Sequence, residues 1–144
     1  IARNMRPDEI DQYLALSGMD SYFPDMAARF LAATPGQVWL MVDENNLPFL
    51  VGGLIPIRKG VYEAWLAGTM EGWEKHGFAI TRFCRKQVDD LLKTEAHRVH
   101  VVSLAGRNHA HEWYERGIGM KREGVLKGYF SNGADAVMFA KGNF

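Results

Sequence analysis

Glu63 is the first residue of this chain whose type and setting could support chemistry. It stands within the apolar run Val61–Leu66, so a carboxylate lies in the middle of a predicted strand. A carboxylate held among apolar neighbours can accept a proton, directly or through a water molecule, and is a candidate general base. A solvent-facing place in the alternation of the strand is the competing interpretation. His109 and His111, further along the chain, are alternative bases or ordinary surface histidines.

A second candidate site is the segment 74–79, which reads Glu-Lys-His-Gly-Phe-Ala. It precedes a long amphipathic pattern, and the first backbone N–H groups of a helix have no partner within the helix. Two small residues, Gly77 and Ala79, would let an anion approach these groups closely. An ordinary helix start is the alternative interpretation. The predicted anion-binding residues are His76, Gly77, Phe78 and Ala79.

The composition argues against several other kinds of chemistry. Cys84 is the only cysteine, which excludes an intramolecular disulfide, and its place on an apolar helix face indicates a core residue. The histidines do not stand at metal-ligand spacing, so we predict no metal. Seventeen basic residues balance seventeen acidic ones, which disfavours nucleic acid as a partner. With no apolar run of about 20 residues to span a membrane, we expect a cytoplasmic protein.

The elements that must position these candidates can be predicted from apolar periodicity. Two short helices are expected over 7–18 and 24–33, followed by strands over 38–42, 47–57 and 61–66. The clearest helix runs from about Gly77 to Lys93, because apolar residues recur there every three or four positions. A strand over 99–104, a helix from Asn108 to about 117 and a hairpin that turns at 131–134 follow. We therefore expect one α/β (α+β) domain, 1–144, with mostly antiparallel strands.

This order of elements resembles the GNAT fold of Gcn5-related N-acetyltransferases over nearly the whole chain. In that family the helix after the third strand begins with Gln/Arg-x-x-Gly-x-Gly/Ala, whose backbone amides hold the pyrophosphate of acetyl-CoA. Gly77 and Ala79 match this motif, whereas Glu74 departs from it, since a carboxylate there would repel a pyrophosphate. The resemblance implies a mixed, mostly antiparallel sheet flanked by about four helices, with acetyl-CoA as the co-substrate.

The second family motif, Asn-x-x-Ala-x-x-x-Tyr-x-x-x-Gly-Phe, fits in two registers. With Asn108 in the first position, Gly119 matches but Glu115 takes the place of the catalytic tyrosine. One residue earlier, Ala110 and Tyr114 match, and an extra residue is needed before Gly119. We favour the first register because it needs no insertion. The resemblance assigns Asn108 to the pantetheine arm of acetyl-CoA and Tyr114 as the candidate acid for the departing thiolate.

The resemblance as a whole implies an acetyl-CoA-dependent N-acetyltransferase acting on an unknown primary amine, in a small molecule or a protein. Glu63 would be its base, and a backbone amide near Ala67 and Gly68 would be the oxyanion donor. The competing class is a catalytically silent GNAT-like structural or interaction protein. A narrower resemblance to small GNAT-like proteins of tailed bacteriophages, including an internal virion protein, favours this alternative. Such a protein would bind virion or host proteins and reside in the virion.

Overall fold

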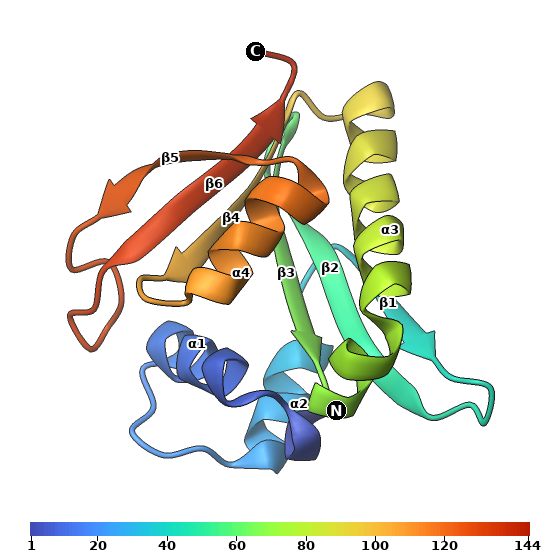
Figure 1. The fold of residues 1–144 in the computed structure, drawn as a ribbon. Helices are drawn as coiled ribbons and strands as arrows, with labels where there is room; N and C mark the ends of the chain where they lie inside the picture. Colours follow the sequence, from blue (N-terminus) through green and yellow to red (C-terminus); the bar gives the residue numbers. More distant parts are fainter.

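A single six-stranded sheet forms the centre of the computed structural model, which describes residues 1–144 (Figure 1). The strands follow the order β1-β2-β3-β4-β6-β5, and every neighbouring pair is antiparallel except β3 and β4. The expectation of a mixed, mostly antiparallel sheet is therefore confirmed. The strands are β1 (Gln37–Val42), β2 (Pro48–Arg58), β3 (Val61–Gly68), β4 (Arg98–Leu104), β5 (Lys121–Leu126) and β6 (Ala136–Gly142).

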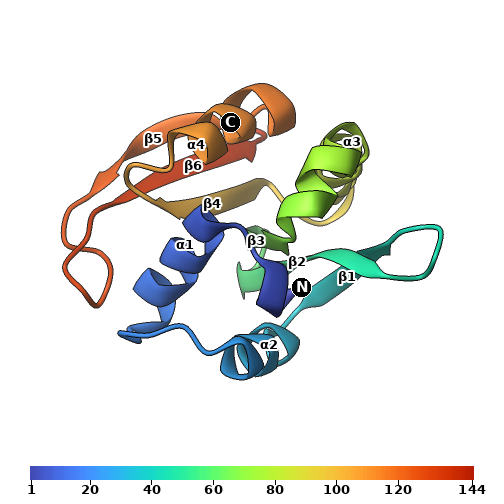
Figure 2. The ribbon, with the colours of Figure 1, turned by 60° about the horizontal axis from the view of Figure 1, so that its bottom comes forward.

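Helices cover both faces of this sheet, as the two views show (Figures 1 and 2). The first two lie on one face, and the other two lie on the opposite face. None of them is long and apolar enough to cross a membrane. The helices are α1 (Pro7–Ser17), α2 (Pro24–Ala32), α3 (Met70–Thr94) and α4 (Asn108–Glu112), with a short 3₁₀ turn over Ala2–Asn4.

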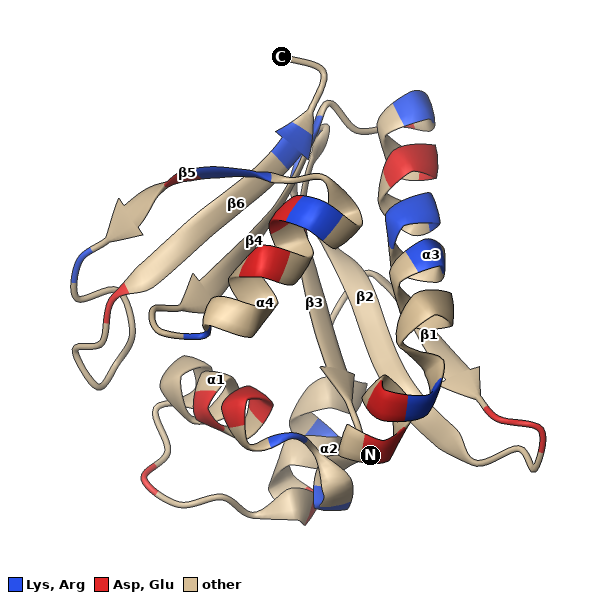
Figure 3. Cartoon of the chain, in the orientation of Figure 1, with Lys and Arg blue, Asp and Glu red and all other residues tan.

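The main core lies between α3 and the sheet. The apolar stripe expected from the sequence faces inward, with Ile80, Cys84 and Val88 buried against β2, β4 and β6. Burial raises the pKa of the Cys84 thiol to about 12, which suits a packing role. The outward face carries mixed charges (Figure 3), including the pair Lys86–Asp90 at 2.5 Å. A smaller core joins α1 to β4 and β6 through Ala15.

The start of α3 differs from our expectation. We predicted the helix from about Gly77, but it begins at Met70, directly after β3. Thr69 caps it, because its hydroxyl accepts the N–H of Gly72 at 2.9 Å. His76 then interrupts the helix with non-helical angles (φ −125°, ψ 20°). The apolar periodicity marks only the part after this kink, which is why it predicts the helix from about Gly77.

The predicted helix over 108–117 is present, but its second half is wound as a π-helix. After α4, residues Trp113–Ile118 form π turns, and the N–H of Gly119 returns to the carbonyl of Tyr114. A π turn holds one residue more than an α turn. The segment thus contains the extra residue that the second motif register requires before Gly119, whereas we had favoured the register without it.

Beyond Glu63 and His100 the two central strands diverge. Their parallel ladder contains only three residue pairs, from Val61–Arg98 to Glu63–His100. The rest of β3, residues 64–68, and the rest of β4, residues 101–104, do not pair with each other. A V-shaped gap with two unpaired backbone edges therefore opens in the middle of the sheet.

Candidate functional site at the divergence of the central strands

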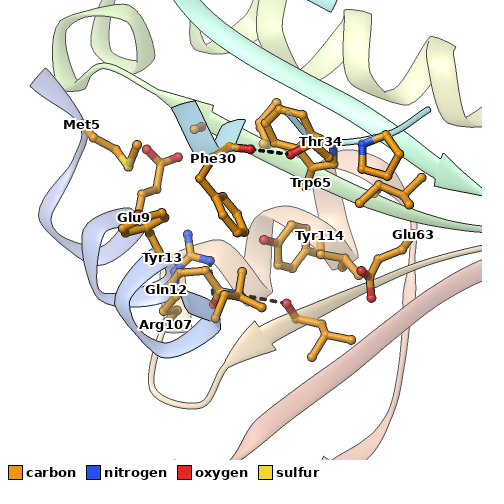
Figure 4. Close-up of a pocket in the computed structure, with 18 of the residues that line it drawn as sticks. Met5, Glu9, Gln12, Tyr13, Phe30, Thr34, Glu63, Trp65, Arg107 and Tyr114 are labelled. Carbon is orange, nitrogen blue, oxygen red and sulfur yellow. Dashed lines mark hydrogen bonds between the residues drawn. The ribbon is translucent and has the colours of Figure 1, made fainter. Parts of the chain in front are cut away.

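The gap between β3 and β4 opens into a cavity of about 380 Å³ (Figure 4). This space, which we call the α1-side cavity, is walled by α1, α2, the diverging strands and the π-helix. A smaller space of about 150 Å³, the α3–α4 cavity, lies beside it and is lined by Trp73, His109 and Trp113 among others. Tyr114 and Leu66 line both cavities. Larger pockets of this kind are the usual location of small-molecule sites.

Glu63 lies at the closed end of the gap, in the last residue pair before the strands part. Its side chain lines the α1-side cavity and is 32% exposed, so it is partly buried and still accessible to solvent. The Oε1 atom lies 3.5 Å from Nε2 of His100, which is its partner in the ladder. A carboxylate in this position can receive a proton from a molecule in the cavity.

Tyr114 of the π-helix lines the same cavity and lies beside Glu63 in Figure 4. The ring packs on Trp113 and Phe139, with centroids 5.7 and 5.5 Å away. Trp113 in turn donates its Nε1–H to Thr81 of α3 at 2.8 Å, which fixes the π-helix against that helix. The structure therefore brings the two candidate catalytic residues, Glu63 and Tyr114, to one cavity.

The unpaired edge of β4 is satisfied by a side chain of α1. Gln12 donates its Nε2–H to the carbonyl of Val102 at 3.0 Å, and its Oε1 accepts the N–H of Leu104 at 2.5 Å. Arg107 holds the same helix, since its guanidinium donates to Asp8 through Nε and Nη2, each at 3.1 Å. Backbone groups that lose a strand partner must find another one. Here α1 supplies it.

The unpaired edge of β3 is occupied by the N-terminal segment. Met5 pairs with Thr69 in an antiparallel bridge, and Oε2 of Glu9 accepts the N–H of Gly68 at 3.1 Å. The other oxygen of Glu9 accepts the Nε1–H of Trp73 at 3.1 Å, and the Arg6 guanidinium lies over the Trp73 ring. This end of the gap, where we expected an oxyanion donor, is thus already filled by a carboxylate.

Burial raises the pKa of Glu9 to about 6. The carboxyl is only 5% exposed, and desolvation disfavours its charged form. Arg6, the N–H of Gly68 and Arg107 act in the opposite direction. Arg107 is itself almost buried, and its pKa is raised because Tyr114 and Asp8 outweigh the desolvation that would lower it.

The predicted anion-binding residues lie at the kink of α3. His76 stacks on Phe49 with centroids 4.3 Å apart, Phe78 is 92% exposed, and Ala79 is partly buried. A side chain added at Gly77 would meet nothing within 4 Å, so space for a ligand exists there. However, Gly77 is inside α3, and the free N–H groups of the helix start lie one to two turns earlier.

The remaining candidates lie away from the α1-side cavity. Asn108 is exposed at the first position of α4 and lines neither cavity. His111 is buried, with Nε2 3.1 Å from Oγ of Ser103, and desolvation lowers its pKa. Only His109 reaches the α3–α4 cavity.

Sequence reasoning missed the side chains that fill the gap, above all Glu9, Gln12 and Arg107. Glu9 stands in the first turn of α1, where an acidic residue is ordinary. One signal could have found it: Glu9 precedes Tyr13 by four residues, so both share a helix face, and an aromatic residue in a short helix indicates the apolar side. Trp73, another residue outside the predicted site, lines the α3–α4 cavity.

Comparison with solved structures identifies the fold. A ribosomal-protein-alanine N-acetyltransferase from Brucella melitensis superposes with a TM-score of 0.69 at 12% identity, covering 94% of this chain and 91% of that one. A GNAT superfamily phosphinothricin acetyltransferase from Sinorhizobium meliloti, solved in complex with acetyl-CoA, gives 0.64 at 15% identity, over 99% and 84%. A spermidine N-acetyltransferase variant from Vibrio cholerae gives 0.64 at 15%, over 86% and 76%.

No family model matches the chain, and no curated protein matches it in sequence. The structural likenesses are nevertheless extensive, because each covers most of both chains. This protein therefore has the GNAT fold, in agreement with the resemblance seen in its motifs. At identities this low the likeness identifies the architecture alone, so any activity must be argued from the site.

Proposed function

We propose that this protein is an acetyl-CoA-dependent N-acetyltransferase that acts on a primary amine. The observation that carries the proposal is the convergence of Glu63 and Tyr114 on one cavity where the central strands diverge. Support also comes from the solved GNAT-fold structures, several of which are named as acetyltransferases and one of which holds acetyl-CoA.

In the proposed reaction the two side chains divide the proton transfers. The amine must lose a proton to become a nucleophile, and the Glu63 carboxylate takes it, directly or through water. The amine nitrogen then bonds to the thioester carbonyl carbon, and the carbon–sulfur bond breaks. Tyr114 donates its hydroxyl proton to the sulfur that leaves. The π-helix is what allows this assignment, because it supplies the extra residue that the tyrosine register needs.

The proposed contacts to acetyl-CoA follow the family motifs. His76, Gly77, Phe78 and Ala79 would face the pyrophosphate, and Asn108 the pantetheine arm. The open space at Gly77 supports this placement. The N–H of Gly68 can act as the oxyanion donor only after Glu9 has moved away, because the Glu9 carboxylate now accepts its hydrogen bond.

Glu9 is also the observation that favours a second candidate function. A carboxylate held by Gly68 and Trp73 satisfies the strand edge without any ligand. A catalytically silent protein that keeps the fold and binds other proteins would retain such an arrangement. The phage virion component suggested by the narrower resemblance belongs to this candidate and stays a prediction.

Calorimetric titration with acetyl-CoA and with free CoA separates the two candidates. The enzyme proposal expects saturable one-site binding, roughly micromolar, and loss of that binding in Gly77→Glu. Gln87→Glu is the matched control, because it adds the same charge ten residues further along α3. A Glu9→Ala variant tests the block at Gly68 directly. Absence of heat at millimolar ligand in both the parent protein and Glu9→Ala, with both folded, would favour the silent protein.

Replacing Tyr114 by Phe tests the proposed acid. The ring packing on Trp113 and Phe139 remains, while the transferable proton is lost. We expect acetyl transfer to slow by about 10²–10⁴-fold with little change in acetyl-CoA affinity. Tyr129→Phe is the control, because Tyr129 lines the same cavity from an exposed position. Equal rates in both variants would remove Tyr114 from the mechanism.

A further inference from the structure

The α1-side cavity has a mainly hydrophobic lining that contains two carboxylates. We infer that it takes a monoamine with an aromatic or apolar body, whose single ammonium group lies at Glu63, and not a polyamine. The transfer step of this inference rests on the proposed function. The binding step rests on the cavity itself and can be tested without acetyl-CoA.

Hydrophobic side chains from separate elements form most of the wall, and five of them are aromatic. Fourteen of the twenty lining residues are hydrophobic. Phe30 of α2 packs edge to face on Tyr13 of α1 at 5.5 Å, and Trp65 of β3 and Tyr114 of the π-helix face them across the cavity (Figure 4). Flat apolar groups are bound favourably between such rings, because their burial removes apolar surface from water.

Only one negative charge in this wall is available to a ligand. The lining contains two acidic side chains, Glu9 and Glu63, which lie on opposite sides of the cavity in Figure 4. Glu9 is committed to Gly68 and Trp73, whereas Glu63 has only the His100 ring nearby, at 3.5 Å. An ammonium group on the ligand is therefore expected at Glu63, where the proposed transfer would take place.

A second ammonium group would find no carboxylate partner. It would lie among the aromatic rings or toward Arg107, a buried cation that is paired with Asp8. Moving an unpaired charge out of water is costly. Aromatic rings also attract cations, so a polycation held by the rings is the alternative that an experiment has to reject.

The test is calorimetric titration of the full chain, without acetyl-CoA, with 2-phenylethylamine, spermidine and 2-phenylethanol. We expect the amine to bind about tenfold or more tightly than either of the other two, because it alone combines the ring with one charge for a hydrogen-bonded ion pair. Glu63→Gln should reduce its affinity to that of the alcohol. Phe30→Ala should weaken both aromatic ligands. Glu44→Gln, in an exposed turn, is the matched control and should change nothing.

Several outcomes would overturn the inference. These are spermidine binding as tightly as the aromatic amine, equal affinities for the amine and the alcohol, unchanged affinity in Glu63→Gln, and no binding of any amine. Acetyl transfer, assayed separately, keeps the two proposals apart. Tight amine binding with no transfer would count against the enzyme and leave the cavity assignment standing. Acetyl transfer to spermidine alone would support the enzyme and overturn the cavity assignment.

Discussion

At the scale of single residues, three side chains define the site: Glu63 and Tyr114 line the cavity, and Glu9 occupies the N–H groups of Gly68 and Trp73. Glu63 stands out because a charge interrupts an apolar strand, and Tyr114 because a motif places it. Glu9 has no such signature, since an acid in the first turn of a helix is ordinary. Its role depends on Gly68, 59 positions away, and on Trp73. A local sequence pattern cannot predict a contact between residues so far apart in the chain.

The raised pKa of Glu9 leads to a prediction about stability and pH. Its pKa rises from 4.5 to about 6 on folding, so the folded state favours the protonated form. The protonation of Glu9 therefore adds about 2 kcal/mol to the free energy of unfolding below about pH 4.5. This stabilisation is lost as the pH rises through about 6. Urea unfolding between about pH 4 and 8 measures it.

The comparison that isolates this effect is with Glu9→Gln, which cannot ionise. The free energy of unfolding of the parent protein, minus that of the variant, should fall across this pH interval. Arg6 and Arg107, the cations that face Glu9, remain charged throughout and do not contribute to the change. A flat difference would show that Glu9 ionises as it does in the unfolded chain.

At the scale of elements, periodicity predicted the presence of the helices and strands better than their ends. The stripe of apolar residues in α3 is strong only after the kink at His76, and the Thr69 cap went unnoticed. The π-helix was not predictable from the pattern, because one extra residue in a helix changes neither composition nor period clearly. It was visible only as the insertion that one motif register demanded.

The attachment of α1 to β4 can be tested with one substitution. Gln12→Ala leaves the carbonyl of Val102 and the N–H of Leu104 without their side-chain partner. We expect a loss of about 1–3 kcal/mol in the free energy of unfolding, because unsatisfied buried backbone groups are costly. Gln87→Ala on α3 is the matched control, because the side chain of Gln87 makes no hydrogen bond and its removal should change stability little.

At the scale of the whole molecule, the sheet consists of two antiparallel halves joined by a three-residue parallel ladder. The order of elements was enough to predict this architecture. The gap in the middle was not, because it depends on where two strands stop pairing, and both continue as regular apolar strands in the sequence.

Hydrogen exchange should distinguish the two kinds of backbone partner in this sheet. The amides of Gly68 and Leu104 are held by side chains of α1, so they open whenever that helix detaches. Amides within the β2–β3 ladder open only when the sheet itself unfolds. We expect Gly68 and Leu104 to exchange faster than their neighbours in the ladders. Equal protection would mean that α1 and the sheet unfold together.

The short ladder between β3 and β4 also bears on how the chain reaches this structure. The strands β1, β2 and β3 follow one another through tight turns, whereas β3 and β4 meet only across the whole length of α3. Closing this long loop costs conformational entropy, and the three residue pairs of the ladder give little stabilisation in return. We therefore expect the β1–β3 meander to form early and the junction of the two halves to form last, as α3 docks. A substitution at Val99, which belongs to the junction and not to the meander, should then change the unfolding rate much more than the folding rate.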